Sequence, residues 1–134
     1  MINGNILHTC HEEGFKEGEI YGAYKIFFGT LVSESRLRII NLLRGGRKNV
    51  SQIMAELKDE QTAVSHDLAR LRECGFVEVE EKGKFRYYKL NEATIKPLMD
   101  LIDRHMAGNC VHILRARKEK KTNNEKVRRS KNGG

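Results

Sequence analysis

Residues 61–77 determine the fold class and read QTAVSHDLARLRECGFV. Apolar residues recur in this stretch at helical spacing, at Val64, Leu68 and Leu71, so one side of the predicted helix should pack on a core. Gly75 follows as a helix stop. The opposite side is polar near the start of the helix. A helix of this kind is typical of the element that enters the major groove in helix-turn-helix proteins.

Three predicted helices precede this stretch. Apolar spacing predicts the first over about residues 20–31 and the second over about 33–43, with Ser33 or Ser35 as its N-cap and the glycine pair 45–46 as its stop. Ser51 is the expected N-cap of a short third helix, which the polar turn 58–61 ends. A short helix, a tight turn and a longer helix are the parts of a helix-turn-helix.

After Gly75 the apolar period changes from helical to alternating. Val77 and Val79 alternate with glutamates, and aromatic residues alternate in the same way after the turn 82–84, which predicts a β-hairpin. Tyr87 and Tyr88 should point to opposite faces, one of them inward on the face of Phe85. The hairpin is the expected wing beside the recognition helix.

A last long helix should begin after Asn91 as its N-cap and break or bend at residues 108–109. Pro97 is tolerable because it lies near the first turn. The helix carries an apolar stripe made of Ile95, Leu98, Met99, Ile102 and Met106. The whole order predicts a mainly α protein with a small β-hairpin, a winged helix-turn-helix.

The composition predicts a single domain. A chain of 134 residues with 39% hydrophobic content can form one modest hydrophobic core. We expect an N-terminal arm over residues 1–18, the winged domain over 19–114 and a basic, partly disordered tail over 115–134. No apolar run is long enough for a membrane span and the polar start does not resemble a signal peptide, so a cytoplasmic protein with reduced thiols is expected.

Positive charge is concentrated in the tail. The net charge is +7, and the tail holds nine of the 25 basic residues but only two of the 18 acidic ones, which leaves 16 of each in the body. Such a run is typical of a solvated extension, and non-specific attachment to DNA is the alternative. In the body, a DNA-binding face must come from local segregation of charge, as in the acid-free stretch 35–55.

The recognition stretch resembles that of the ArsR/SmtB family of winged-helix repressors, through its Val-Ser-His-x-Leu core at 64–68 and the Leu-Arg-x-x-Gly end at 71–75. The similarity extends to residues 31–43, which look like the family's second helix, and to residues 82–90, which look like its wing. It covers about residues 20–106. The resemblance implies a homodimer built on the first and last helices, repression by occupying a palindromic operator, and release when an inducer binds.

Two groups of side chains are candidates for contact with double-stranded DNA. Polar residues at the start of the recognition helix could reach base edges or hold phosphate. Basic residues before it and on the wing are candidate phosphate contacts, the alternative being a merely solvated face. The first group is Gln61, Thr62, Ser65, His66 and Arg70, and the second is Arg36, Arg38, Lys82, Lys84 and Arg86.

The sensor sites that the resemblance implies are incomplete. Where metal sensors of the family carry cysteines in the third helix, this chain has Asn49-Val50-Ser51. Of the four positions of the family's carboxylate and histidine zinc site, only Glu92 and His105 could ligate, which is too few for a zinc tetrahedron. In a third arrangement of the family, two cysteines of the recognition helix act with one nearer the C-terminus. Cys74 matches the second of the two, Arg70 stands in place of the first, and Cys110 could supply the distant one.

A different thiol site is a further hypothesis. Three distant cysteines could converge in a dimer and bind a soft metal ion or metalloid, or react with an oxidant, with histidines as partners. The alternative is that one cysteine is a small buried residue and the other two are incidental. The cysteines are Cys10, Cys74 and Cys110, and the histidines are His11, His105 and His112.

The sequence predicts a regulator rather than an enzyme, because no nucleophile with a neighbouring base, phosphate loop or paired carboxylates can be recognised. The expected function is sequence-specific binding to an inverted-repeat operator, as a repressor that an inducer releases. The alternative is a constitutive or architectural DNA-binding protein without an effector. The inducer, the operator and the regulated genes are not encoded in any recognisable pattern.

Overall fold

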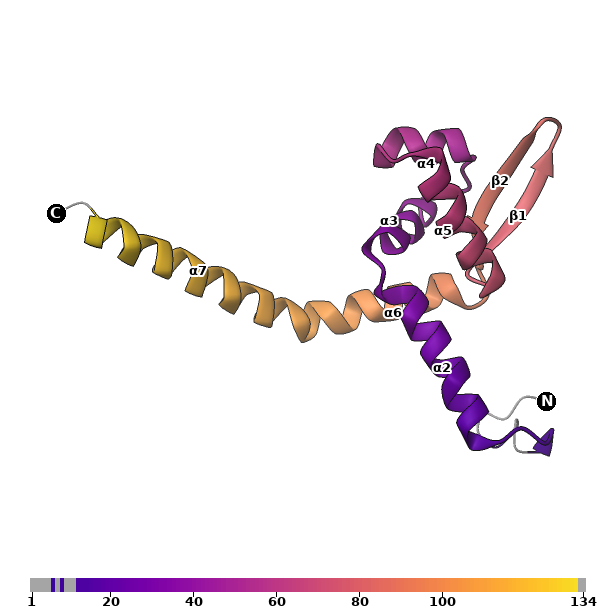
Figure 1. The fold of residues 1–134 in the computed structure, drawn as a ribbon, viewed down its shortest axis with the longest axis horizontal. Helices are drawn as coiled ribbons and strands as arrows, with labels where there is room; N and C mark the ends of the chain where they lie inside the picture. Colours follow the sequence, from indigo (N-terminus) through magenta and orange to yellow (C-terminus); the bar gives the residue numbers. More distant parts are fainter. Residues whose placement is uncertain (1–5, 7, 9–11, 133–134) are drawn as a thin grey trace. The chain divides into compact units, whose positions relative to one another are not determined.

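The computed structural model describes residues 6, 8 and 12–132. The chain divides into two compact units, Met1–Asn91 and Glu92–Gly134. The first unit contains the helices α2 to α5 and one β-hairpin, and the second contains α6 and α7 (Figure 1). The predicted boundary between domain and tail, at residue 115, falls inside α7.

From residue 12 onward, the helices before the hairpin are α2 (Glu17–Val32), α3 (Glu34–Leu43), α4 (Val50–Leu57) and α5 (Gln61–Glu73). In Figure 1, α3, α4 and α5 cluster together beside the hairpin. The core between these elements is apolar and closed, since each of its members exposes 5% or less of its surface. These members are Ile20, Ile39, Ile40, Leu43, Ile53, Val64, Leu68, Leu71, Phe76, Val77 and Leu90.

The predicted helix starts are partly correct. Ser33 caps α3, and its hydroxyl accepts a hydrogen bond from the Arg36 backbone N–H. The predicted cap of α4 at Ser51 is wrong. Asn49 caps this helix in a capping box with Gln52, in which each side chain accepts from the other residue's backbone N–H at 2.9 Å. Lys58 ends α4 in the left-handed conformation, with φ of 54°.

The hairpin consists of β1 (Val77–Lys82) and β2 (Phe85–Leu90), antiparallel with Val77 opposite Leu90. Gly83 opens the two-residue turn with φ of 60°, where a Cβ atom would be disfavoured. The backbones of Lys48 and Tyr88 exchange two hydrogen bonds, at 2.8 and 3.0 Å, so the segment before α4 is fastened to the wing.

The two wing tyrosines point to opposite faces as predicted, but the direction is reversed. Because cross-strand partners share a face, Tyr88 lies on the core face with Val79, whereas Tyr87 lies on the other face with Phe85. Phe85 is 55% exposed. The alternation of residue types along the chain predicted the strands correctly, but it did not predict which face of the hairpin would be buried.

In the second unit, α6 spans Ile95–Gly108 and α7 spans Cys110–Asn132, so the predicted break at residues 108–109 is confirmed. Asn91 does not cap α6, because Thr94 is its N-cap. Instead, Asn91 belongs to the first unit, where its side-chain amide donates to the Gly75 carbonyl at 3.1 Å and its backbone N–H donates to that of Phe76.

The basic tail is helical to Asn132, whereas the sequence predicted partial disorder. Good helix formers dominate it, and neither proline nor glycine interrupts it before residue 133. Its polar composition predicted correctly that no face would be buried, since residues 112–130 are all exposed. Among the described residues, no helix is both long and apolar enough to cross a bilayer.

Candidate DNA-binding surface

Helix α5 presents a polar surface at its N-terminal half. Gln61, Thr62, Ser65 and His66 are exposed there, and Arg70, one turn after His66, is half-buried. The opposite side of the helix is anchored, since Val64, Leu68 and Leu71 are buried, as predicted. The structure thus brings all five predicted residues of α5 onto one helix that is held by the core.

The first turn of α5 is open to a ligand at its backbone. Its N-cap is Glu60, whose side chain makes no capping hydrogen bond. The first N–H groups of a helix have no partner within the helix and point outward along its axis. Such groups can hold a phosphate, which the positive end of the helix dipole also favours.

Arg36 has partners within the fold. Its Nε donates to the Thr30 carbonyl at 2.8 Å and its Nη2 to the Gly29 carbonyl at 3.2 Å, both in the last turn of α2. Its Nη1 lies 3.6 Å from a carboxylate oxygen of Asp67 on α5, and both side chains are largely buried. The sequence pattern predicted only a phosphate contact at the surface for this arginine. The contacts with α2 and Asp67 were not predictable because they join positions far apart in the chain.

The wing carries basic side chains at its tip. Lys82, Lys84 and Arg86 are exposed, with the guanidinium of Arg86 4.0 Å from a Glu81 oxygen. Arg38, on α3, is also exposed and pairs with Glu34 at 2.8 Å. Surface pairs of this kind are weak and leave the cations open to exchange with another anion.

Arg47 supports the wing from outside, a role that the sequence did not indicate. It donates to Glu80 at 2.8 Å, and its guanidinium carbon lies 5.0 Å from the centre of the Tyr87 ring. The hydrogen bond from Arg47 lowers the pKa of the Glu80 carboxyl below its ordinary value. The sequence signal for this contact was an arginine in an acid-free stretch together with an aromatic residue in the wing.

Comparison with known proteins identifies the family. Residues 33–79 match the model of the bacterial regulatory protein, arsR family. An uncharacterised HTH-type transcriptional regulator of Methanocaldococcus jannaschii is 33% identical over 70 residues, which cover 52% of this chain and 79% of that protein. The chain belongs to the ArsR family. It is a transcriptional regulator with a DNA-binding helix-turn-helix, and the family and its relatives are regulators rather than enzymes.

Two further relatives extend this comparison for the ArsR family. The HTH-type transcriptional regulator NmtR of Mycobacterium tuberculosis is 36% identical over 70 residues, covering 52% of this chain and 58% of that protein. A solution structure from Mycobacterium bovis, described as a homodimeric winged helix-turn-helix DNA-binding domain, aligns with a TM-score of 0.66. It is 23% identical and the alignment covers 74% of this chain and 94% of that one, so it supports the winged-helix fold.

The predicted thiol site is only partly within the described structure of this ArsR-family chain. Cys10 and His11 lie outside the described residues. Cys110 is half-buried and His105 and His112 are exposed, all in the second unit, whereas Cys74 is half-buried in the first. Within the described part of the chain, no three His, Cys, Asp or Glu side chains lie close enough together to hold a metal ion. Convergence of the three thiols stays a prediction.

Cys74 makes a specific contact at the end of α5. Its Sγ lies 3.4 Å from Oγ1 of Thr30, a completely buried residue of α2. The Thr30 hydroxyl donates its one proton to the Ile26 carbonyl at 2.7 Å. Because a hydroxyl has a single proton, the thiol of Cys74 is the donor to Thr30. This contact links the end of the recognition helix to α2.

Proposed function

We propose that this ArsR-family chain is a homodimeric repressor that binds an inverted-repeat operator through α5 and the wing. The observation that carries the proposal is the exposed polar start of α5 on a helix whose other face is buried in the core. A helix held in this way can enter the major groove without losing its own packing. The two-fold axis of a dimer would then present two such helices to two half-sites about one helical turn apart.

Base readout is assigned to the polar residues of α5. His66 and Arg70 can donate hydrogen bonds to acceptors on the edge of a base, and the amide of Gln61 can both donate and accept. Thr62 and Ser65 are assigned to base edges or to phosphate at the open first turn. The five residues lie within about three turns, a length that fits the major groove.

Phosphate contact is assigned to Arg38 and to the wing residues Lys82, Lys84 and Arg86. These cations are exposed and their ion pairs are at the surface, so exchange for a phosphate costs little. Arg36 is left out of this set, because its guanidinium already contacts two carbonyls and Asp67. Withdrawing it would leave a largely buried carboxylate without its partner.

The dimer proposal rests on apolar side chains that the chain leaves uncovered. On α2, Tyr24 and Phe28 are 38% and 57% exposed, and they line an apolar groove of about 350 Å³. Leu101 on α6 is 55% exposed. Other apolar residues of the first and last helices, on which the resemblance implies the dimer, are not available for it. Phe27 stacks on Phe76 with ring centres 5.1 Å apart, and two members of the α6 stripe, Ile95 and Met99, are already buried.

Repression is proposed because a small dimer that occupies an operator keeps other proteins from that DNA site. It needs no contact with another protein to do so. Release by an inducer is the finer part of the proposal, with a soft metal ion, a metalloid or a thiol oxidant as the class. The contact between Cys74 and Thr30 supports this choice, since it couples a sulfur atom, a soft ligand, to the recognition helix. The alternative is a constitutive or architectural DNA-binding protein, whose affinity would not respond to any of these agents.

Substitutions on α5 test the proposal directly. Operators can be selected from a random duplex pool with the wild-type protein, and affinities measured for the selected and an unselected duplex. We expect His66→Ala and Arg70→Ala to lower the specific affinity by about 5- to 100-fold each, the effect of losing one base contact, with a smaller change on random DNA. Arg72→Ala is the matched control, because Arg72 is exposed on the same helix near its far end. An unchanged ratio of specific to random binding in both variants would show that α5 is not the reading helix.

A further inference from the structure

Helix α7 is an exposed, strongly basic rod. The described side chains from Arg115 to Arg129 include eight cations against Glu119 and Glu125. The rise of 1.5 Å per residue makes this segment about 21 Å long, which equals about six base-pair steps of duplex DNA. Helix dimensions and charge density therefore match a phosphate backbone over about half a turn of DNA.

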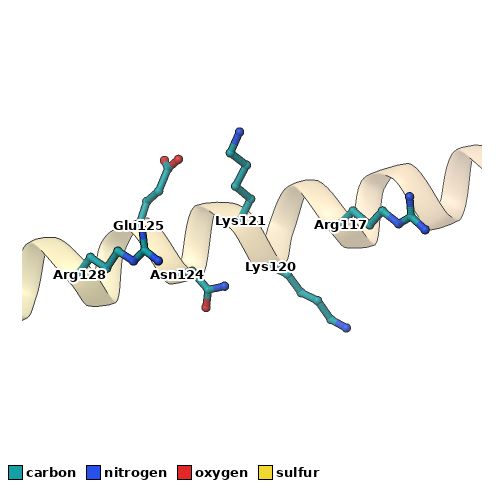
Figure 2. A pocket seen from close by; sticks show the side chains of 6 residues that line it. All are labelled: Arg117, Lys120, Lys121, Asn124, Glu125 and Arg128. Carbon is teal, nitrogen blue, oxygen red and sulfur yellow. The ribbon is translucent and has the colours of Figure 1, made fainter.

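Four of these eight cations lie on one side of α7. At 3.6 residues per turn, Arg117, Lys121 and Arg128 lie within about 40° of one another around the axis. With Lys120, Asn124 and Glu125 they line a solvent-open hollow of about 380 Å³. Figure 2 shows the side chains of these residues along the helix. Glu125 is the one acidic side chain at this hollow. We call Arg117, Lys120, Lys121 and Arg128 the basic cluster.

The basic cluster is compensated within its own helix only in part, by Glu125, which lies four positions from Lys121 and three from Arg128. Arg117 is three and four positions from Lys120 and Lys121, and like charges at these spacings destabilise a helix. No side chain between residues 112 and 130 is buried, so packing does not repay this cost. A polyanion lying along the helix would neutralise the repulsion.

The side chains of α7 favour nucleic acid over a membrane surface or a protein as the partner. A helix that lies in a membrane surface needs an apolar face. Between residues 115 and 130, Ala116 and Val127 are the only apolar side chains, and no aromatic anchor for a protein interface is present. Nucleic-acid phosphate requires only cations and donors, and arginine and lysine provide both.

We propose that α7 is a second DNA-binding element, which holds duplex phosphates through the basic cluster independently of base sequence. This inference rests on the proposed function, since a chain that binds an operator through α5 keeps its tail at high effective concentration near the same duplex. The helix raises affinity for operator and random DNA alike. Sequence choice stays with α5.

The test measures how affinity depends on salt. In the full chain, all four residues of the basic cluster are replaced by glutamine, which keeps helix propensity and removes the charge. Dissociation constants are measured on the operator and on a random duplex from 50 to 300 mM salt. Each lost phosphate contact lowers the steepness of the log–log salt plot by about 0.9, so we expect a decrease of about 2 to 4 per bound chain. At 100 mM salt, we expect affinity for both duplexes to fall about 10- to 100-fold.

The matched control keeps charge at the same four positions, through Arg117→Lys, Lys120→Arg, Lys121→Arg and Arg128→Lys. It should retain the wild-type salt slope, and circular dichroism should show that both variants are folded. A slope within about 0.5 of the wild type in the glutamine variant overturns the proposal. A second result would also overturn it: the wild type binds phosphatidylserine vesicles and the glutamine variant does not, while the salt slopes of the two proteins on DNA are equal.

Failure of the proposed function would give a different result. A wild-type protein without any preference for a selected duplex would remove the operator-binding role of α5. The salt slope on random DNA would still decide the role of α7, because that measurement needs no operator.

Discussion

At the scale of single residues, Arg36 joins the end of α2 to the recognition helix. The carbonyls of Gly29 and Thr30 belong to the last turn of α2, where carbonyl groups have no partner within the helix. The guanidinium satisfies both and places a positive charge at the negative end of the helix dipole. Its third contact, with Asp67, holds α5 at a fixed distance from α2. One side chain of α3 therefore connects this helix to both α2 and α5.

We expect Arg36→Ala to lower the free energy of unfolding by about 2–3 kcal/mol, because two carbonyls lose a charged donor and Asp67 is left largely buried without its partner. Denaturant unfolding at one fixed protein concentration measures this. Arg38→Ala is the matched control, since Arg38 is exposed and pairs only along its own helix with Glu34, and we expect a change within about 0.5 kcal/mol. Equal losses in the two variants would contradict the internal role of Arg36.

Single-residue roles were the least predictable from sequence. The apolar positions of α5 were correct because helical periodicity is a local property. Arg36 and Arg47 appeared as surface cations, since their partners Asp67 and Glu80 lie 31 and 33 positions further along the chain. Local pattern identifies which residue types line a face. It does not identify which distant group a long side chain will meet.

At the scale of elements, the helices α2 to α6 and the hairpin were predicted in their order and their approximate bounds, whereas most of α7 was expected to be a partly disordered tail. The other errors lie at the ends of the elements. Asn49 and Ser51 are both good N-cap residues, and only the capping box with Gln52 decides for Asn49. Asn91 resembles a cap for the same chemical reason, but its amide is used to hold the Gly75 carbonyl at the start of the hairpin. Capping residues compete for several backbone groups, and tertiary contacts decide the outcome.

The junction between α5 and α2 gives a prediction about sensing. The Cys74 thiol donates to Thr30, whose own proton is used for Ile26. A metal ion or an oxidant that removes the thiol proton would leave sulfur and oxygen lone pairs facing each other. The end of α5 should then move away from α2. We expect cadmium or hydrogen peroxide to lower operator affinity by about 5-fold or more, in the range of typical coupling between two sites.

Operator titrations of the reduced wild type and of single-cysteine variants measure this effect. Cys74→Ser should abolish the response to both agents, because serine keeps a donor to Thr30 but offers no soft ligand. Cys110→Ser is the comparison variant, as Cys110 is half-buried like Cys74 but lies in α7. A response that persists in it assigns the site to Cys74 without Cys110, and a lost response supports the predicted convergence of the thiols. A response that persists in Cys74→Ser would place the sensor elsewhere. A wild type that never responds would favour the constitutive alternative.

At the scale of the whole molecule, the exposed apolar surface is the property that the chain alone does not explain. Besides Tyr24 and Phe28, the side chains of Tyr21 and Val32, which lie on the same side of α2, are 49% and 80% exposed. Contiguous apolar surface of this kind marks an interaction site. The sequence predicted a dimer from the resemblance and from the α6 stripe. It could not predict that Phe27 would be used inside the subunit, because that depends on the position of Phe76.

We expect Phe28→Glu to convert the protein to a monomer at micromolar concentration. A large apolar side chain is worth about 1.5–3 kcal/mol when buried, and an isologous interface contains it twice, so the dimer Kd should rise at least about a hundredfold. Sedimentation velocity over a range of concentrations measures the change. Phe85→Glu is the matched control, because Phe85 is 55% exposed, close to the 57% of Phe28, but lies near the tip of the wing. This variant should remain dimeric. A wild-type monomer at these concentrations, or equal dissociation in the two variants, would rule out α2 as the dimer surface.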